Sequence, residues 1–170
     1  VKNQPCLILM NHSSFTDMKL AMGIFYPQKL GIVTSVDAMT GILGKLMRLL
    51  GCTYTHKYIT DLTLFKDMED MLKTNKSSVL MYPEAGYSFD GCATALPRKM
   101  GVLLKRLGVP VVTVITEGAF HRDPLYNMLQ IRDVKVSAHV KCIATAEEVK
   151  AKSVDELDAL IAEAFSFDNF

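Results

Sequence analysis

The polar segment from Asn11 to Asp17 contains the residue types that a base for a hydroxyl group requires. It reads Asn-His-Ser-Ser-Phe-Thr-Asp and follows the apolar run 6–10. A histidine with an ordinary pKa of about 6.5 is suited to accept a proton at neutral pH. A carboxylate on its other ring nitrogen would fix the tautomer and stabilise the imidazolium. Residues five apart on a helix point about 140° away from each other, so His12 and Asp17 can meet only across a turn between a strand and a helix.

The same segment allows two other interpretations. In the first, one of the residues Ser13, Ser14, Thr16 and Asp17 merely caps a helix, and His12 is simply a polar residue at the end of a strand. Ser13 or Ser14 beside His12 can also be the nucleophile of an esterase or thioesterase. Neighbouring strand residues point to opposite faces, and the sequence has no Gly-x-Ser-x-Gly turn to expose a serine. The serine mechanism is therefore disfavoured.

A second polar segment, Tyr82 to Ser88, follows another strand-like run. Pro83 ends a strand ladder, Gly86 permits close approach of the backbone, and Glu84 is expected at the mouth of the sheet. Backbone N–H groups in such a turn can point at an anion or a developing oxyanion. Ordinary turn chemistry explains the Pro and Gly equally well. A third polar stretch, Thr53 to Lys57, overlaps the end of another short strand-like run.

Apolar runs and helical repeats alternate along the chain and must position these segments. We expect strands at 6–10, 30–34, 52–55, 78–82, 109–116 and 134–142, and helices at 17–25, 40–50, 61–74, 99–107 and 154–165. This alternation is typical of an α/β domain, here a mostly parallel mixed sheet flanked by helices. The last strand is expected at an edge, with Val134, Val136, Ala138 and Val140 facing inward. Ligands of such sheets bind beyond the carboxyl ends of the strands, where the polar segments lie.

Composition indicates a single folded domain and argues against a nucleic-acid-binding protein. The chain has 170 residues, a net charge of +1 and 49% hydrophobic residues, which predicts one folded domain over 1–170 without the basic excess of nucleic-acid binding. Its four scattered cysteines form no Cys-x-x-Cys pair, so we interpret them as reduced thiols of a cytoplasmic protein. No apolar run approaches the roughly 20 residues that span a bilayer. Because Val1 is not a starting Met, we expect the sequence to be an excerpt of a slightly longer chain, from which an anchor can have been trimmed.

Four short blocks follow one another between residues 5 and 116. They are Asn-His-x4-Asp at 11–17, Gly-Cys-Thr-Tyr-Thr-His-Lys at 51–57, Tyr-Pro-Glu-Ala-Gly-Tyr-Ser at 82–88 and Val-Pro-Val-Val at 109–112, with Lys-Met-Gly at 99–101. In type and order they resemble the glycerolipid acyltransferases of the lysophosphatidic acid acyltransferase type. The pattern of that family is Asn-His-x4-Asp, Gly-x-x-Phe-x-x-Arg, Phe-Pro-Glu-Gly-Thr-Arg-Ser and an apolar Val-Pro strand.

The resemblance implies a glycerol-phosphate-acyltransferase-like fold and a 1-acylglycerol-3-phosphate O-acyltransferase type of enzyme in phospholipid biosynthesis. Such an enzyme moves a fatty acyl group from acyl-CoA or acyl carrier protein to a hydroxyl of a lysophospholipid or glycerol phosphate. By this analogy His12 takes the hydroxyl proton and Asp17 orients His12, without an acyl-enzyme, a metal or a cofactor. The residues implied for substrate binding are Ser13, Ser14, Tyr54, Lys57, Pro83, Glu84, Ala85, Gly86, Ser88 and Lys99.

The sequence departs from the family pattern where an anionic head group would be held. Lys57 replaces an Arg, and a lysine supplies charge but no bidentate fork. Residues 85–87, Ala-Gly-Tyr, replace Gly-Thr-Arg, so the phosphate-facing Arg of the family is a tyrosine. Either Lys57, Lys99 or Arg98 holds the anionic group, or the acceptor is not the usual lysophosphatidate.

Residues 40–50 suggest contact with a membrane. They form an expected helix of mostly large apolar residues around Lys45 and Arg48, which share one face. This is typical of an interfacial helix, although a core helix with two solvated bases fits equally well. We therefore expect a peripheral protein on the inner face of the membrane, with an acyl thioester donor and a lysolipid acceptor as partners. A lipid-binding module whose His–Asp pair no longer acts is the remaining alternative.

Overall fold

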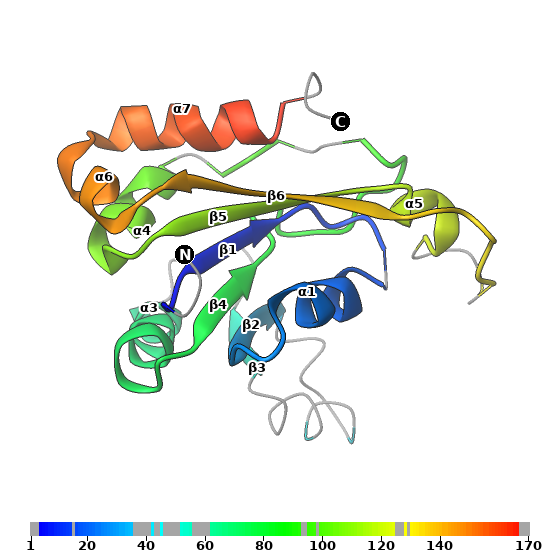
Figure 1. Cartoon of the computed structure of the whole chain (residues 1–170), viewed down its shortest axis with the longest axis horizontal. Coiled ribbons are helices and arrows are strands. Elements are labelled where there is room, and N and C mark those ends of the chain that lie inside the picture. The colour runs from blue at the N-terminus through cyan, green and yellow to red at the C-terminus, as the bar shows by residue number, and fades with distance from the viewer. Residues whose placement is uncertain are drawn as a thin grey trace.

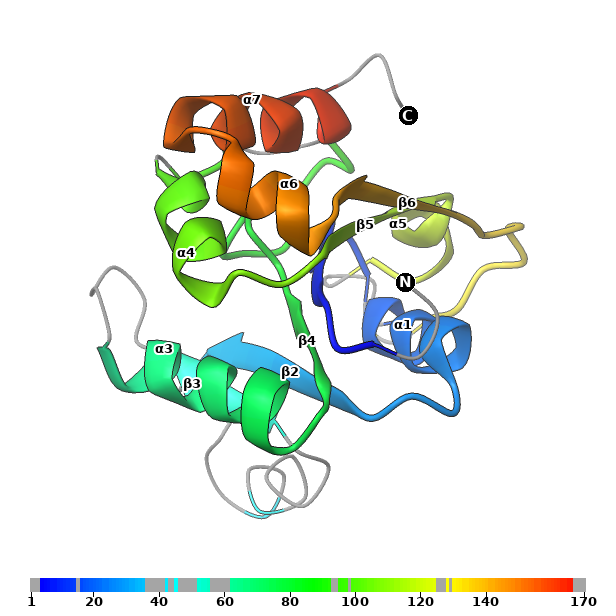
Figure 2. The same ribbon diagram turned by 60° about the vertical axis from the view of Figure 1, so that its left-hand side comes forward.

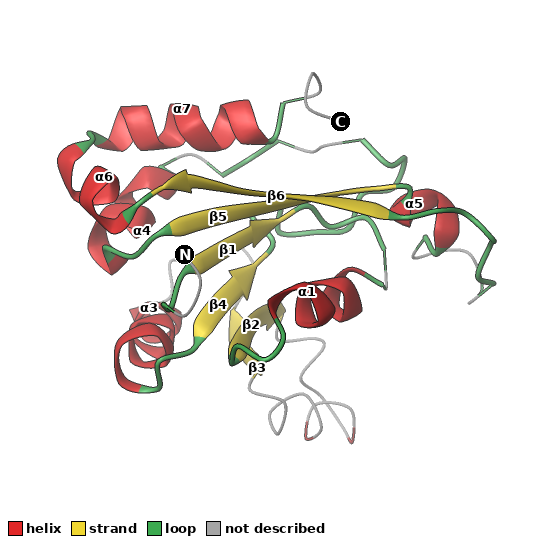
Figure 3. Cartoon of the chain, in the orientation of Figure 1, coloured by secondary structure: helices red, strands yellow, loops and turns green. Residues whose placement is uncertain are grey.

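A six-stranded sheet runs through the middle of the molecule (Figures 1 and 3). Its strands are β1 (Leu7–Met10), β2 (Leu30–Ser35), β3 (Cys52–Thr55), β4 (Ser78–Met81), β5 (Val111–Glu117) and β6 (Ser137–Ala144), in the order β3-β2-β4-β1-β5-β6. Five strands are parallel, and β6 pairs with β5 in the antiparallel sense. The predicted α/β class with a mostly parallel mixed sheet is confirmed.

The computed structural model describes residues 4–14, 16–35, 42, 45, 52–55, 62–92, 95–97, 99–124, 128 and 130–166. The described helices are α1 (Asp17–Phe25), α3 (Leu62–Glu69) with its π-helical continuation η2 (Asp70–Thr74), α4 (Met100–Leu107), α5 (Ala119–Arg122), α6 (Ala146–Ala151) and α7 (Val154–Ala164). The helix expected at 40–50 lies largely outside the described residues, and so do Lys57 and Arg98.

Helices cover both faces of the sheet (Figure 2). On one face Ala21 of α1 packs in a cluster with Ile8, and on the other Leu104 of α4 and Leu157 of α7 pack in a cluster with Leu7. Successive strand residues point to opposite faces, so a strand between two helical layers must be apolar throughout. All four residues of β1 are buried, as the continuous apolar run predicts.

The connections after β1 and β4 determine where a ligand can bind. These strands are neighbours, but β1 leads into α1 on one face and β4 leads into α4 on the other. In open α/β sheets ligands bind at such a reversal, at the carboxyl ends of the two strands. The polar segments 11–17 and 82–88 follow these two strands, so the topology brings them to the same end of the sheet.

The last part of the chain differs from the expectation in two details. β6 begins at Ser137, because its ladder ends where Ser137 pairs with Glu117, the last residue of β5. Val140 does not face the core, since it is 49% exposed on this partly covered edge strand. The short helices α5 and α6 were not expected, although a capping box of Thr145 and Glu148 starts α6. The apolar stripe of α7 packs inward as predicted.

Candidate active site

The turn between β1 and α1 brings His12 and Asp17 into contact. His12 Nδ1 lies 3.1 Å from Asp17 Oδ2. The same oxygen accepts the backbone N–H groups of Ser13 at 2.8 Å and Ser14 at 2.9 Å. The contact therefore crosses a turn, as the spacing requires. Holding the turn and contacting the imidazole are not competing roles here, since one carboxylate oxygen does both.

The three donors around Asp17 Oδ2 fix the tautomer of His12. Two are backbone N–H groups, and a carboxylate oxygen can only accept, so Nδ1 is the protonated ring nitrogen. Nε2 is then the basic nitrogen, and it bonds to none of the described residues. Asp17 is fully buried, whereas the His12 side chain remains 15% exposed. The ring nitrogen left to accept a proton is therefore Nε2.

Asn11 ties the end of β1 to β5. Its Oδ1 accepts the backbone N–H of Thr116 at 2.9 Å and the Thr116 hydroxyl at 3.0 Å. Its Nδ2 donates to the backbone oxygen of Thr116 at 3.1 Å. Both residues are buried, and buried polar groups need such partners. The amide therefore fixes the position from which the next residue, His12, leaves the sheet.

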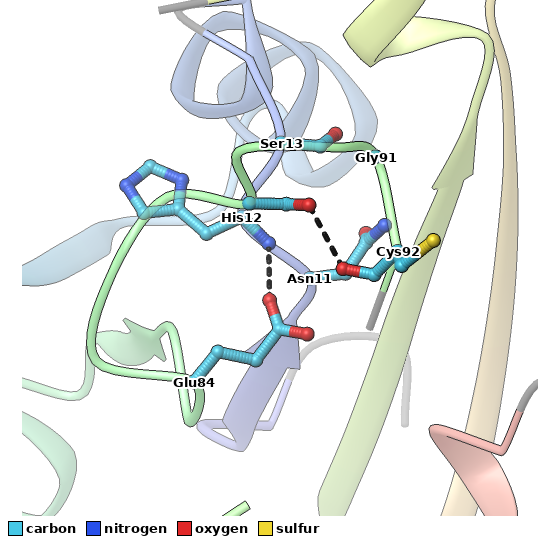
Figure 4. A pocket seen from close by; sticks show the side chains of 7 residues that line it. Asn11, His12, Ser13, Glu84, Gly91 and Cys92 are labelled. Atoms are coloured by element: carbon cyan, nitrogen blue, oxygen red, sulfur yellow. Dashed lines mark hydrogen bonds between the residues drawn. The ribbon is translucent and has the colours of Figure 1, made fainter. Parts of the chain in front are cut away.

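Residues of the segment after β4 form hydrogen bonds with both the N–H and the carbonyl oxygen of His12. The Glu84 carboxylate accepts the His12 N–H at 3.0 Å, and the Ser88 N–H donates to the His12 backbone oxygen at 2.7 Å. Figure 4 shows the Glu84 side chain reaching this N–H while the imidazole points away from the other residues that are drawn. Glu84 thus lies at the mouth of the sheet and positions His12 through its backbone.

Two tyrosine rings enclose the imidazole, a contact that the sequence analysis missed. The Tyr82 ring stacks on it with centroids 3.8 Å apart and planes at 17°, and the Tyr87 ring with centroids 3.6 Å apart and planes at 29°. Burial raises the pKa of both phenols, and the Asp17 carboxylate adds to the rise, so both rings are neutral. Aromatic residues near both ends of the 82–88 block were the available signal.

Neither serine beside His12 is arranged as a nucleophile among the described residues. The Ser14 hydroxyl bonds to Thr16 Oγ1 at 2.8 Å and to the backbone oxygen of Asp123 at 2.9 Å. The Ser13 side chain points away from the imidazole in Figure 4. Both serines contribute their backbone N–H groups to the turn instead. The geometry favours His12 over a serine as the reacting group.

Some of the remaining predicted site residues lie in the 82–88 segment, and the others lie elsewhere in the fold or outside the described residues. Pro83 is buried, while Ala85 and Gly86 are exposed at the bend of the 82–88 segment. Lys99 is exposed at the start of α4, which packs against α7. Tyr54 belongs to β3, but its side chain, like Lys57, lies outside the described residues. The described part of the site is therefore the His12 turn and the segment around it.

A small pocket and a larger groove lie in the described part of the chain. The small pocket of about 10 Å³, little more than the room one water needs, adjoins the backbone of His12 and is lined by Asn11, His12, Ser13, Glu84, Ser88, Gly91 and Cys92. The groove of about 320 Å³ lies between β6 and α7, and His12 does not line it. Within the described residues, no group of three His, Cys, Asp or Glu side chains is placed to hold a metal ion.

Two comparisons relate the chain to known proteins. The fold is similar to the crystal structure of the 1-acyl-sn-glycerophosphate (LPA) acyltransferase PlsC from Thermotoga maritima, with a TM-score of 0.65 and 17% sequence identity. The match covers 98% of this chain and 69% of that chain. A family model described as Acyltransferase matches residues 1–117, which include the His12 turn and the 82–88 segment. The chain therefore belongs to the Acyltransferase family, as its four ordered blocks predict.

Proposed function

We propose that the protein transfers a fatty acyl group from a thioester, acyl-CoA or acyl carrier protein, to a hydroxyl of a lysophospholipid or glycerol phosphate. One observation carries the proposal: His12 Nδ1 is bonded to the buried Asp17 carboxylate, which leaves Nε2 as the basic nitrogen. The similar PlsC structure is that of a 1-acyl-sn-glycerophosphate acyltransferase, which supports a glycerolipid acceptor. Membership of the Acyltransferase family supports the reaction type.

The reaction needs one base and two correctly placed substrates. His12 Nε2 takes the proton of the acceptor hydroxyl while the hydroxyl oxygen bonds to the carbonyl carbon of the thioester. The carbon–sulfur bond then breaks, and the leaving thiolate receives the proton from the imidazolium. The products are an ester and a free thiol, and His12 returns to its neutral form. The Asp17 carboxylate stabilises the imidazolium between the two proton transfers. Holding both substrates in reacting geometry supplies much of the rate.

Lys57 remains our proposed contact for the anionic group of the acceptor. Of the cations considered from the sequence, Lys99 lies at the start of α4 beside α7, and no described contact joins it to the His12 turn. Tyr87, which replaces the phosphate-facing Arg of the family pattern, stacks on His12. The head group would then be bound by a single lysine instead of a guanidinium.

We further propose that the protein works at a membrane surface, where a lysolipid acceptor resides. Exposed apolar side chains near the end of α1 support this, with Met22 exposed by 44%, Ile24 by 37% and Tyr26 by 83%. Ile42, in the expected interfacial helix, is 87% exposed. None of the described helices is long and apolar enough to span a bilayer. Location on the cytoplasmic face stays a prediction.

The proposal is tested with purified protein, labelled acyl-CoA or acyl carrier protein, and a panel of lysolipids and glycerol phosphate. We expect labelled ester and stoichiometric free thiol, and a 10²–10⁴-fold lower turnover for His12→Ala, the range for a lost general base. His139→Ala is the control, because His139 is exposed on β6 and pairs with Glu117 outside the site. Labelled free fatty acid would indicate a hydrolase, and lysolipid binding without thiol release would indicate a binding module. An unaltered rate for His12→Ala would exclude the mechanism.

A further inference from the structure

We infer that Tyr82 and Tyr87 are positioning residues for His12, whose rings hold the imidazole between them and stabilise the imidazolium that forms when His12 takes the acceptor proton. This inference rests on the proposed function and adds to it two residues that act through the base. Both rings lie within stacking distance of the imidazole, at 3.8 and 3.6 Å between centroids.

The two rings and the Asp17 carboxylate together restrain the orientation of the imidazole. Tyr82 covers one face and Tyr87 also stacks on the ring, while the Nδ1 edge faces the buried Asp17 carboxylate. Rotation of the imidazole about its side-chain bonds would break the bond to Asp17 and collide with a tyrosine ring. The orientation of Nε2 is therefore fixed before any substrate binds, which is the condition for efficient proton transfer.

One short segment supplies both the rings and the backbone contacts of His12. Tyr82 directly follows β4, and the chain then bends, with the Ala85 N–H donating to the Tyr82 backbone oxygen at 3.1 Å and Ala85 at φ 55°. The bend brings Tyr87 back toward the imidazole. Glu84 and Ser88 of the same segment bond to the His12 main chain. The backbone of His12 and both rings are therefore held by the same short segment.

The electrostatics of the stack favour the protonated form. A cation over the face of an aromatic ring is attracted by the ring quadrupole, more strongly where water is excluded. Both phenols are partly shielded and neutral, because burial raises the pKa of Tyr82 and of Tyr87. When Nε2 takes a proton, the positive charge lies between two ring faces and beside the Asp17 carboxylate. The arrangement thus stabilises the charge that develops in the transition state.

Variants at Tyr87 distinguish the effect of the aromatic ring from the effect of the space that the side chain fills. We expect Tyr87→Leu to lower kcat by roughly 5- to 30-fold, the range for one cation–π contact, with little change in the KM of the acceptor. Tyr87→Phe keeps the ring and should keep most of the turnover. The control is Phe89→Leu, since Phe89 lies in the same loop but is 73% exposed. Equal turnover of Tyr87→Leu and the wild type would overturn the inference.

A fluorinated series tests the charge directly. Phenylalanine with one, two or three ring fluorines at position 87 keeps the shape but progressively weakens the negative ring face. We expect kcat to fall stepwise along the series. A flat series would show that the ring only fills space and would overturn the role in stabilising the imidazolium. Because each member keeps an aromatic ring, this series also decides the question if Tyr87→Leu does not fold.

A measurement without turnover distinguishes failure of the inference from failure of the proposed function. In protein with isotope-labelled histidine, ring currents of the two tyrosines should shift the His12 ring protons upfield, and Tyr87→Leu should remove part of that shift. Unshifted protons in the wild type would overturn the stack itself. Wild-type protein with shifted protons but no transfer to any acceptor would instead overturn the proposed function.

Discussion

Replacing Asp17 with Asn removes the charge that the proposed mechanism needs while leaving the turn in place. Asp17 Oδ2 accepts the backbone N–H groups of Ser13 at 2.8 Å and Ser14 at 2.9 Å, and an amide oxygen can accept the same two bonds. The change therefore removes a buried negative charge 3.1 Å from His12 Nδ1 without opening a cavity. Asp17→Ala, in contrast, would leave these two N–H groups without an acceptor and destabilise the turn between β1 and α1.

The expected loss follows from the distance between the charges. In this contact the centres of an imidazolium and a carboxylate lie about 4 Å apart, where two unit charges attract by about 4 kcal/mol at an effective dielectric constant of about 20. Because the proton is only partly transferred in the transition state, we expect a loss of about 2 to 4 kcal/mol, or roughly 30- to 1,000-fold in kcat. The KM of the acceptor should change little, since the lost interaction forms only as charge develops.

Steady-state release of thiol from acyl-CoA measures kcat, and thermal unfolding followed by circular dichroism checks the fold. Asp158→Asn is the matched control, because Asp158 Oδ1 also accepts a backbone N–H, that of Gly101 at 2.6 Å, but lies on α7. We expect the control to keep the wild-type kcat. If Asp17→Asn also turned over like the wild type with its fold intact, the carboxylate would have no part in catalysis and the reasoning would be refuted.

The remaining predictions concern stability. Gly101→Ala should destabilise the protein by about 2 kcal/mol or more, because a Cβ there would collide with the backbone oxygen of Val154. Gly23→Ala on the exposed side of α1, where a Cβ meets nothing within 4 Å, should instead stabilise by about 0.5–1 kcal/mol in the same denaturant titration. The capping boxes of α6 and α7 make stability depend on pH. Backbone N–H groups of Thr145 and Ser153 hold the pKa values of Glu148 and Glu156 below their ordinary value of 4.5. A carboxyl with a lowered pKa in the folded state stabilises above the pKa of the unfolded chain, and this stability is lost as pH falls through the folded pKa. Glu148→Gln/Glu156→Gln should therefore lose less stability than the wild type on acidification from neutral pH to below 4.5, and parallel losses would contradict this account.

The sequence alone determined the local parts of the site and the class of the fold. An apolar run buried on both faces, followed by a polar turn, placed His12 at a strand end and Asp17 in the first turn of α1. Their contact is predictable because only five residues separate them, so local geometry leaves one way to meet. The alternation of strands and helices similarly predicts the mostly parallel sheet, because side-chain periodicity is a local property.

Only the tertiary structure decided what surrounds the imidazole. The Glu84 carboxylate accepts the His12 N–H although 72 residues separate the two in sequence, and Asn11 bonds to Thr116 across a separation of 105 residues. These contacts depend on β1 lying between β4 and β5 and on the register of the parallel ladders, which no local pattern specifies. The two tyrosine rings depend further on the bend at Ala85, whose positive φ is unusual for a residue with a side chain. Propensity and spacing are properties of residues that are close in sequence. The surroundings of the His12 imidazole are instead set by residues from different strands that come together only in the folded sheet.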